Sequence, residues 1–90
     1  MDTPQNAEHG KPKAYTVIVN ARKREVQTDV LTFDQVVALA LDPVPTGPNI
    51  LITVTYRHGP HENREGEMKA GQSVFIKNEM IFSVLATDKS

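Results

Sequence analysis

The sequence predicts an α+β fold in which a mixed four- to five-stranded sheet packs on one helix. Two observations carry this prediction. Runs of alternating apolar residues, which are typical of strands with one buried face, lie before and after a single segment with helical periodicity. The last of these runs stops just before a short polar tail. The expected order of elements is therefore strand, strand, helix, strand, strand, strand.

The first two strands are predicted in residues 14–21 and 24–31, joined by a basic turn. Arg22 and Lys23 are expected at the tip of this hairpin. The second strand is expected to bury one face and to expose the other to water. The face that is expected to be buried consists of Val26, Thr28 and Val30.

The helix is predicted in Thr32–Asp42. Thr32 and Gln35 have the spacing of a capping box, in which the two side chains satisfy backbone amides reciprocally. Two prolines after Asp42 end the helix. Leu39 lies off the apolar stripe and is expected to be exposed or to cover a sheet edge. The stripe that is expected to face the sheet consists of Phe33, Val36, Val37, Ala40 and Leu41.

The second half of the chain contains the remaining strands. Asn49–Arg57 is rich in β-branched and aromatic residues, which favours a central strand. Ser73–Thr87 is predicted to be a closing hairpin with its turn at Asn78 and Glu79. Because Glu tolerates a positive φ poorly, this turn is expected to be strained or longer than two residues.

Composition excludes several classes of function. The net charge of −1 predicts no nucleic-acid partner, and no apolar run approaches the ~20 residues that span a membrane. The absence of cysteine excludes disulfides and thiol nucleophiles and fits a cytoplasmic protein. Residues 1–13 hold too few apolar side chains to fold and are expected to be a disordered leader. Residues 14–90 are expected to form one domain, and the protein is expected to be a monomer.

No residue pattern predicts catalysis, a metal or a cofactor. His58, His61 and Glu62 match no strong zinc spacing, and the intervening Gly-Pro turn favours a solvated loop over a metal site. The basic run Arg22–Arg24 offers an anionic partner a site, but solvation at a hairpin tip is the favoured interpretation. No serine has a histidine nearby that would mark it as a nucleophile. The sequence therefore predicts a non-enzyme.

The predicted strand order is that of the ubiquitin-like β-grasp, and six stretches carry a closer resemblance. These stretches are Tyr15–Ala21, Leu31–Val37, Pro45–Asn49, Thr53–Arg57, Gly71–Val74 and Ala86–Ser90. Because they are spread over every predicted element, they are more specific than one short motif. Through them, residues 15–90 resemble one repeat of the bacterial multiubiquitin family, whose members are ubiquitin-like proteins encoded beside conjugation-type enzymes.

This resemblance implies a protein modifier. Such a modifier is processed by a peptidase, adenylated by an activating enzyme and passed through a conjugating enzyme to target proteins. The implied conjugation terminus consists of Thr87, Asp88, Lys89 and Ser90, with the carboxylate of Ser90 as the reacting group. The sequence departs from ubiquitin because it lacks a terminal Gly-Gly, whose missing side chains let a tail enter a narrow channel. The bulkier residues here need a differently shaped partner or a different route.

An apolar patch for partner docking is also predicted. If Val17, Val54 and Val84 point toward the helix, alternation places a second set of apolar residues on the opposite face of the sheet. Docking is favoured over the alternative that some of them are edge residues of the core. The predicted patch consists of Ile18, Leu51, Phe75 and Leu85.

Two other functions stay open at this point. One is a β-grasp interaction module that docks through its sheet and is never conjugated. The other is a sulfur carrier with a C-terminal acyl group, which the missing Gly-Gly disfavours.

Overall fold

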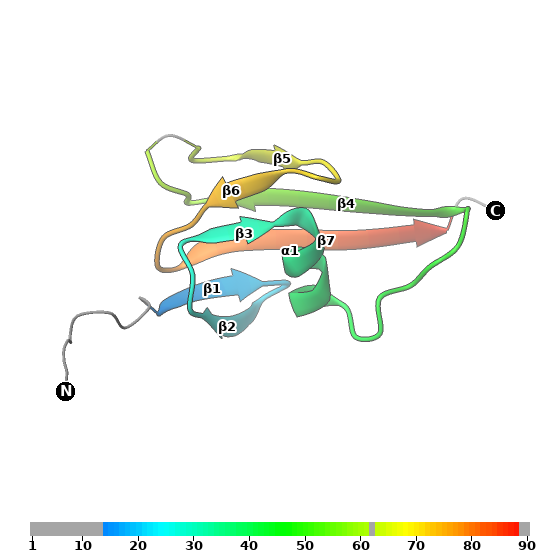
Figure 1. Cartoon of the computed structure of the whole chain (residues 1–90), viewed down its shortest axis with the longest axis horizontal. Coiled ribbons are helices and arrows are strands. Elements are labelled where there is room, and N and C mark those ends of the chain that lie inside the picture. The colour runs from blue at the N-terminus through cyan, green and yellow to red at the C-terminus, as the bar shows by residue number, and fades with distance from the viewer. Residues whose placement is uncertain (1–13, 62, 89–90) are drawn as a thin grey trace, which may run out of the picture.

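The computed structural model describes residues 14–61 and 63–88, and the predicted leader lies outside them. Its elements run in the order shown in Figure 1. The strands are β1 (Tyr15–Val19), β2 (Arg22–Val26), β3 (Val30–Thr32), β4 (Ile50–Arg57), β5 (Gly66–Met68), β6 (Ser73–Phe75) and β7 (Met80–Asp88), and the helix is α1 (Phe33–Ala40). Five strands form one sheet in the order β2-β1-β7-β4-β5, and β3 pairs with β6 separately.

This arrangement confirms the predicted fold class. The large sheet is mixed, because β7 runs parallel to β1 and antiparallel to β4. The single helix contacts β1, β4 and β7 on one face of that sheet. A mixed sheet of this order with one helix across it is a ubiquitin-like β-grasp.

The helix begins where the capping pattern predicts. Thr32 is the N-cap, and its hydroxyl accepts a hydrogen bond from the Gln35 amide at 3.1 Å. The Gln35 side chain accepts in return from the Thr32 amide at 2.9 Å, so the predicted capping box is confirmed. The helix ends at Ala40, two residues earlier than predicted, because Leu41 takes an extended conformation.

The core lies between the helix and the large sheet. Val36 and Val37 are buried from the helix side, and Phe82 is fully buried in β7 with its ring 6.2 Å from that of Tyr56. The buried apolar residues are Val17, Val19, Leu31, Val36, Val37, Val54, Met68, Ile76, Met80, Phe82 and Val84. The face of the large sheet that carries Val17, Val54 and Val84 is therefore the one that packs on the helix.

The β1–β2 turn lies two residues earlier than predicted. Asn20 and Ala21 form it, with φ of 51° and 69°, and Arg22 is already paired with Val19 inside the hairpin. Two positive φ values give the turn a twist that matches its strands, and Asn adopts this conformation more readily than most residues. Arg22 and Lys23 are thus strand residues and not the tip.

The predicted second strand is divided in two. β2 ends at Val26, and β3 belongs to the smaller sheet. Between them the Thr28 hydroxyl accepts from the Val30 amide at 3.3 Å and lies 3.1 Å from its carbonyl oxygen. Such local side-chain bonds compete with strand pairing and bend the backbone. Thr28 and Val30 therefore do not continue the face of Val26.

The predicted closing hairpin is also wrong in its pairing. A turn does form at Asn78 and Glu79, where Glu79 has a φ of 67°, but β6 pairs with β3 and not with β7. Thr16 in β1 determines the new path. Its amide donates to Asn78 Oδ1 at 3.0 Å and its carbonyl oxygen accepts from the Glu79 amide at 2.6 Å. These bonds direct the chain after the turn along β1.

Asn20 fastens the parallel pair where β1 ends. Its amide donates to the Phe82 carbonyl oxygen at 3.0 Å. Its side chain accepts from the Val84 amide at 2.7 Å and donates to the Val84 carbonyl oxygen at 3.0 Å, as a further strand residue would. Beyond Val84, β7 is paired with β4 alone.

We expect Val36→Asp to unfold the domain, because it places an unpaired charge in the fully buried helix–sheet interface. The free energy of unfolding should fall by about 3 kcal/mol or more, a large part of the stability of a small domain. Ala38→Asp, on the exposed side of the same helix, is the matched control. A thermal melt in which both variants resemble the unsubstituted protein would contradict the packing of α1 on the sheet.

We expect two glycine substitutions in the β1–β2 turn to have opposite effects on stability. Asn20→Gly keeps the positive φ but removes both bonds to Val84, which should cost about 1–2 kcal/mol. Ala21→Gly relieves an alanine at a φ of 69° and should stabilise by about 0.5 kcal/mol. Urea denaturation measures both, and equal effects would show that the Asn20 side chain contributes nothing.

Candidate functional site

The face of the large sheet that points away from the helix carries four apolar residues in two pairs. Register places Ile18 beside Ile81, on β1 and β7. At the other end of β7, Leu85 lies opposite Thr53, and Leu51 lies opposite Thr87. Leu51 and Leu85 are therefore diagonal neighbours on adjacent strands, within reach of each other's side chains.

The structure thus divides the predicted patch. Leu51 and Leu85 are exposed by 46% and 63%, and a polar row that includes Ser83 separates them from Ile18. Phase in the last strand could have found Ile81, because it is four residues from Leu85 and so faces the same side. Phe75 does not belong to this face, since β6 is in the smaller sheet, although its side chain is 58% exposed.

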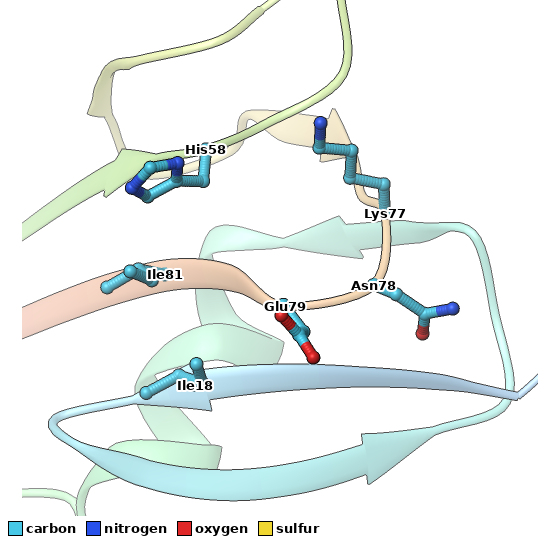
Figure 2. A pocket seen from close by; sticks show the side chains of 6 residues that line it. All are labelled: Ile18, His58, Lys77, Asn78, Glu79 and Ile81. Atoms are coloured by element: carbon cyan, nitrogen blue, oxygen red, sulfur yellow. The ribbon is translucent and has the colours of Figure 1, made fainter.

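A cavity of about 310 Å³ opens beside the Ile18–Ile81 pair. Figure 2 shows these two side chains on neighbouring strands, with His58 just after β4 above them and Glu79 just before β7. His58 and Glu79 both have positive φ, at 59° and 67°. Lys77 completes a polar rim over an apolar floor. An arrangement of this kind suits one anchoring side chain of a protein partner.

The end of β7 differs from the predicted tail. Thr87 and Asp88 are strand residues, paired with Leu51 and Ile50 of β4, and do not extend freely beyond Ala86. The strand continues because β4 offers it an antiparallel partner along its whole length. Lys89 and Ser90 lie outside the described residues. In Figure 1 the end of β7 lies at the far end of the β4–β7 pair, beyond β1 and β5.

The match to a family model agrees with this fold. The model of multiubiquitin matches residues 15–88, from the first residue of β1 to the last residue of β7. The chain belongs to the multiubiquitin family. Membership confirms the resemblance found in the sequence and identifies the domain as ubiquitin-like. Comparisons with curated proteins and with solved structures found no match.

Other kinds of site have little support in the part of the chain that the structure describes. No cluster of three or more His, Cys, Asp or Glu side chains there is arranged to hold a metal ion, and Glu62 of the histidine-containing loop lies outside it. The helix within residues 14–61 and 63–88 is too short to cross a bilayer. The ubiquitin-like fold and the multiubiquitin family are in general non-enzymatic.

We expect Leu85→Arg to leave the fold intact, because its side chain is 63% exposed and an added charge stays in water. The free energy of unfolding should change by less than about 0.5 kcal/mol. The neighbouring Val84→Arg is the matched control, since Val84 points into the core and is only 7% exposed. A melt in which Leu85→Arg loses as much stability as Val84→Arg would place Leu85 in the core.

Proposed function

We propose that this chain is a cytoplasmic, non-catalytic protein modifier, activated at its C-terminal carboxylate and conjugated to target proteins. The observation that supports the proposal most is the position of the Leu51–Leu85 pair. These exposed leucines lie beside the last residues of β7. An activating or conjugating enzyme that binds this end of the outer face therefore has the chain after Asp88 within reach.

The chemistry requires little of the modifier itself. A carboxylate oxygen of Ser90 attacks the α-phosphorus of ATP, pyrophosphate leaves, and an acyl adenylate forms. A thiolate of the enzyme then attacks the acyl carbon and AMP leaves, which gives a thioester. An amine of the target protein attacks the thioester, and the thiol is released as the amide forms. The chain contributes a bound domain and a reacting carboxylate, whereas the acids and bases come from its partners.

The paired end of β7 sets a condition on this route. Thr87 and Asp88 are held by β4, so the carboxylate of Ser90 enters a deep channel only if this last pairing opens. Lys89 and Ser90 also carry side chains where ubiquitin has its two terminal glycines. Both features favour an activating enzyme with a wide, shallow channel over one shaped for Gly-Gly.

A non-conjugated interaction module is the second candidate. The Ile18–Ile81 cavity favours it, because this cavity lies at the other end of the outer face from the end of β7, so a partner bound there would need no covalent chemistry. The two candidates differ in one respect that can be measured, namely whether the carboxylate reacts.

We expect the protein, mixed with ATP and any activating enzyme encoded beside its gene, to gain the mass of an adenylate at Ser90. Removing Lys89 and Ser90, or appending residues that no peptidase trims, should abolish this product with little change in the thermal melt. Leu85→Arg should slow the reaction, since it places a charge in the proposed enzyme contact. Intact-mass spectrometry measures all four proteins.

Two outcomes would defeat the modifier proposal. One is an unreacted terminus under conditions in which the enzyme exchanges pyrophosphate with another modifier. The other is an adenylate on the variant whose tail is blocked. Either would leave the interaction module as the better account.

A further inference from the structure

Among the residues that the structure describes, the outer edge of β2 has backbone hydrogen-bonding groups that pair with no other strand. β2 is the last strand on its side of the sheet and pairs with β1 alone. The amide and carbonyl of Thr16 point toward Asn78 and Glu79, on the β7 side of β1. Because these directions alternate along a strand, the neighbouring residue Val17 bonds to β2, where it pairs with Arg24. By this alternation, Lys23 and Glu25 of β2 direct their amides and carbonyls away from the sheet.

An apolar groove lies beside this edge. It has a volume of about 360 Å³ and runs between the β2–β3 connection and α1. Val26 and Leu31 line it from the strands, and Ala38 and Leu39 line it from the helix. Leu39 lies off the helix stripe that packs on the sheet. Its side chain faces this groove instead and is half-buried there. Figure 1 shows α1 on the face of the sheet, close to its β1–β2 side.

Basic side chains lie on the same face as the groove. Arg22 and Arg24 pair with Val19 and Val17, which face the helix, so both arginines share the face of Val26. Both are exposed. Within residues 14–61 and 63–88, neither has a carboxylate at ion-pair distance. The groove is therefore apolar, and the edge beside it is positively charged.

We propose that the β2 edge and this groove together bind an extended acidic segment of a partner protein. The segment adds a strand to β2 through the amides and carbonyls of Lys23 and Glu25. One apolar side chain of the segment enters the groove at Val26. Side chains two residues apart in a strand share a face. An acidic residue of the segment, two positions from that apolar residue, therefore lies beside Arg24.

The charge of the edge decides between possible occupants. A second copy of this chain that paired edge to edge through Lys23 and Glu25 would place Arg24 opposite its own copy on the groove face, and like charges on directly opposed residues are destabilising. An acidic segment meets the same side chains with favourable charge. The site is separate from the end of β7 and from the outer face, so it does not depend on conjugation.

Charged residues on an edge strand also prevent edge-to-edge aggregation, and a binding measurement separates that role from recognition. The probe is a fluorescein-labelled peptide of about nine residues, with a run of Val and Ile flanked by Asp and Glu. The control peptide has Lys at each acidic position. Fluorescence polarisation should show saturable binding of the acidic peptide alone, and affinity should fall as salt is raised.

Variants of the protein locate the site. The double variant Arg22→Glu with Arg24→Glu should weaken binding by about tenfold or more. The double variant Arg57→Glu with Arg64→Glu, an equal change of two exposed arginines outside β2, should alter affinity by less than about twofold. Ala38→Glu should weaken binding, whereas Ala38→Lys, of similar length and helix propensity, should not. Thermal melts verify that each variant is folded.

Amide chemical shifts provide a second readout that does not depend on any variant. The acidic peptide should shift the amides of Lys23, Glu25 and Ala38 and leave that of Leu85 unchanged. The proposal is overturned if both peptides bind equally, if neither saturates at millimolar concentration, or if the shifts gather around Leu85. None of these results would bear on adenylation of the terminus, so the two proposals can fail separately.

Discussion

The pairing of β7 between β1 and β4 is the constraint on which the rest of this structure depends. β7 is the last strand in sequence and the central strand in space, so the sheet is incomplete until the end of the domain is in place. Its residues Phe82 and Val84 complete the core beneath the helix. Asn20 then uses its backbone and side chain to hold both of them against the end of β1.

The same constraint separates the surfaces that we assign to partners. β4 accompanies β7 as far as Asp88, whereas β1 stops earlier, so the last part of β7 lies at the free end of a two-stranded ribbon. The exposed leucines Leu51 and Leu85 lie on this ribbon. At the opposite margin of the sheet, the positively charged edge of β2 borders an apolar groove. The covalent role and the non-covalent role that we propose would therefore use different parts of one small domain.

The sequence predicted what is encoded by periodicity and missed what long-range bonds decide. Alternation and the capping box were sufficient for the helix, for β4 and for the buried faces of Val17 and Val84. The division of the second strand depends on local bonds of the Thr28 hydroxyl, and the path into β7 depends on bonds between Thr16 and the distant turn. No nearby pattern reveals such partners. Of the residues predicted to form a docking patch, Leu85 is exposed on the outer face of the large sheet, where phase is unambiguous, whereas Phe75 lies in the smaller sheet, and its short strand has too few residues to fix its sheet.

Hydrogen exchange of the amides in β7 tests the central position of this strand most directly. The amide and carbonyl of Val84 both point toward Asn20 and away from β4. Because these directions alternate along a strand, the amide and carbonyl of Ala86 also point away from β4, and they lie past the end of β1. The Val84 amide should exchange slowly, near the limit set by global unfolding, and the Leu85 amide should be protected by β4. The Ala86 amide, which points away from β4 toward water, should exchange much faster than the amides of Val84 and Leu85. Equal protection of Val84 and Ala86 would show that β1 or another segment covers the whole strand, and would contradict the pairing of β7 with β4 alone beyond Val84.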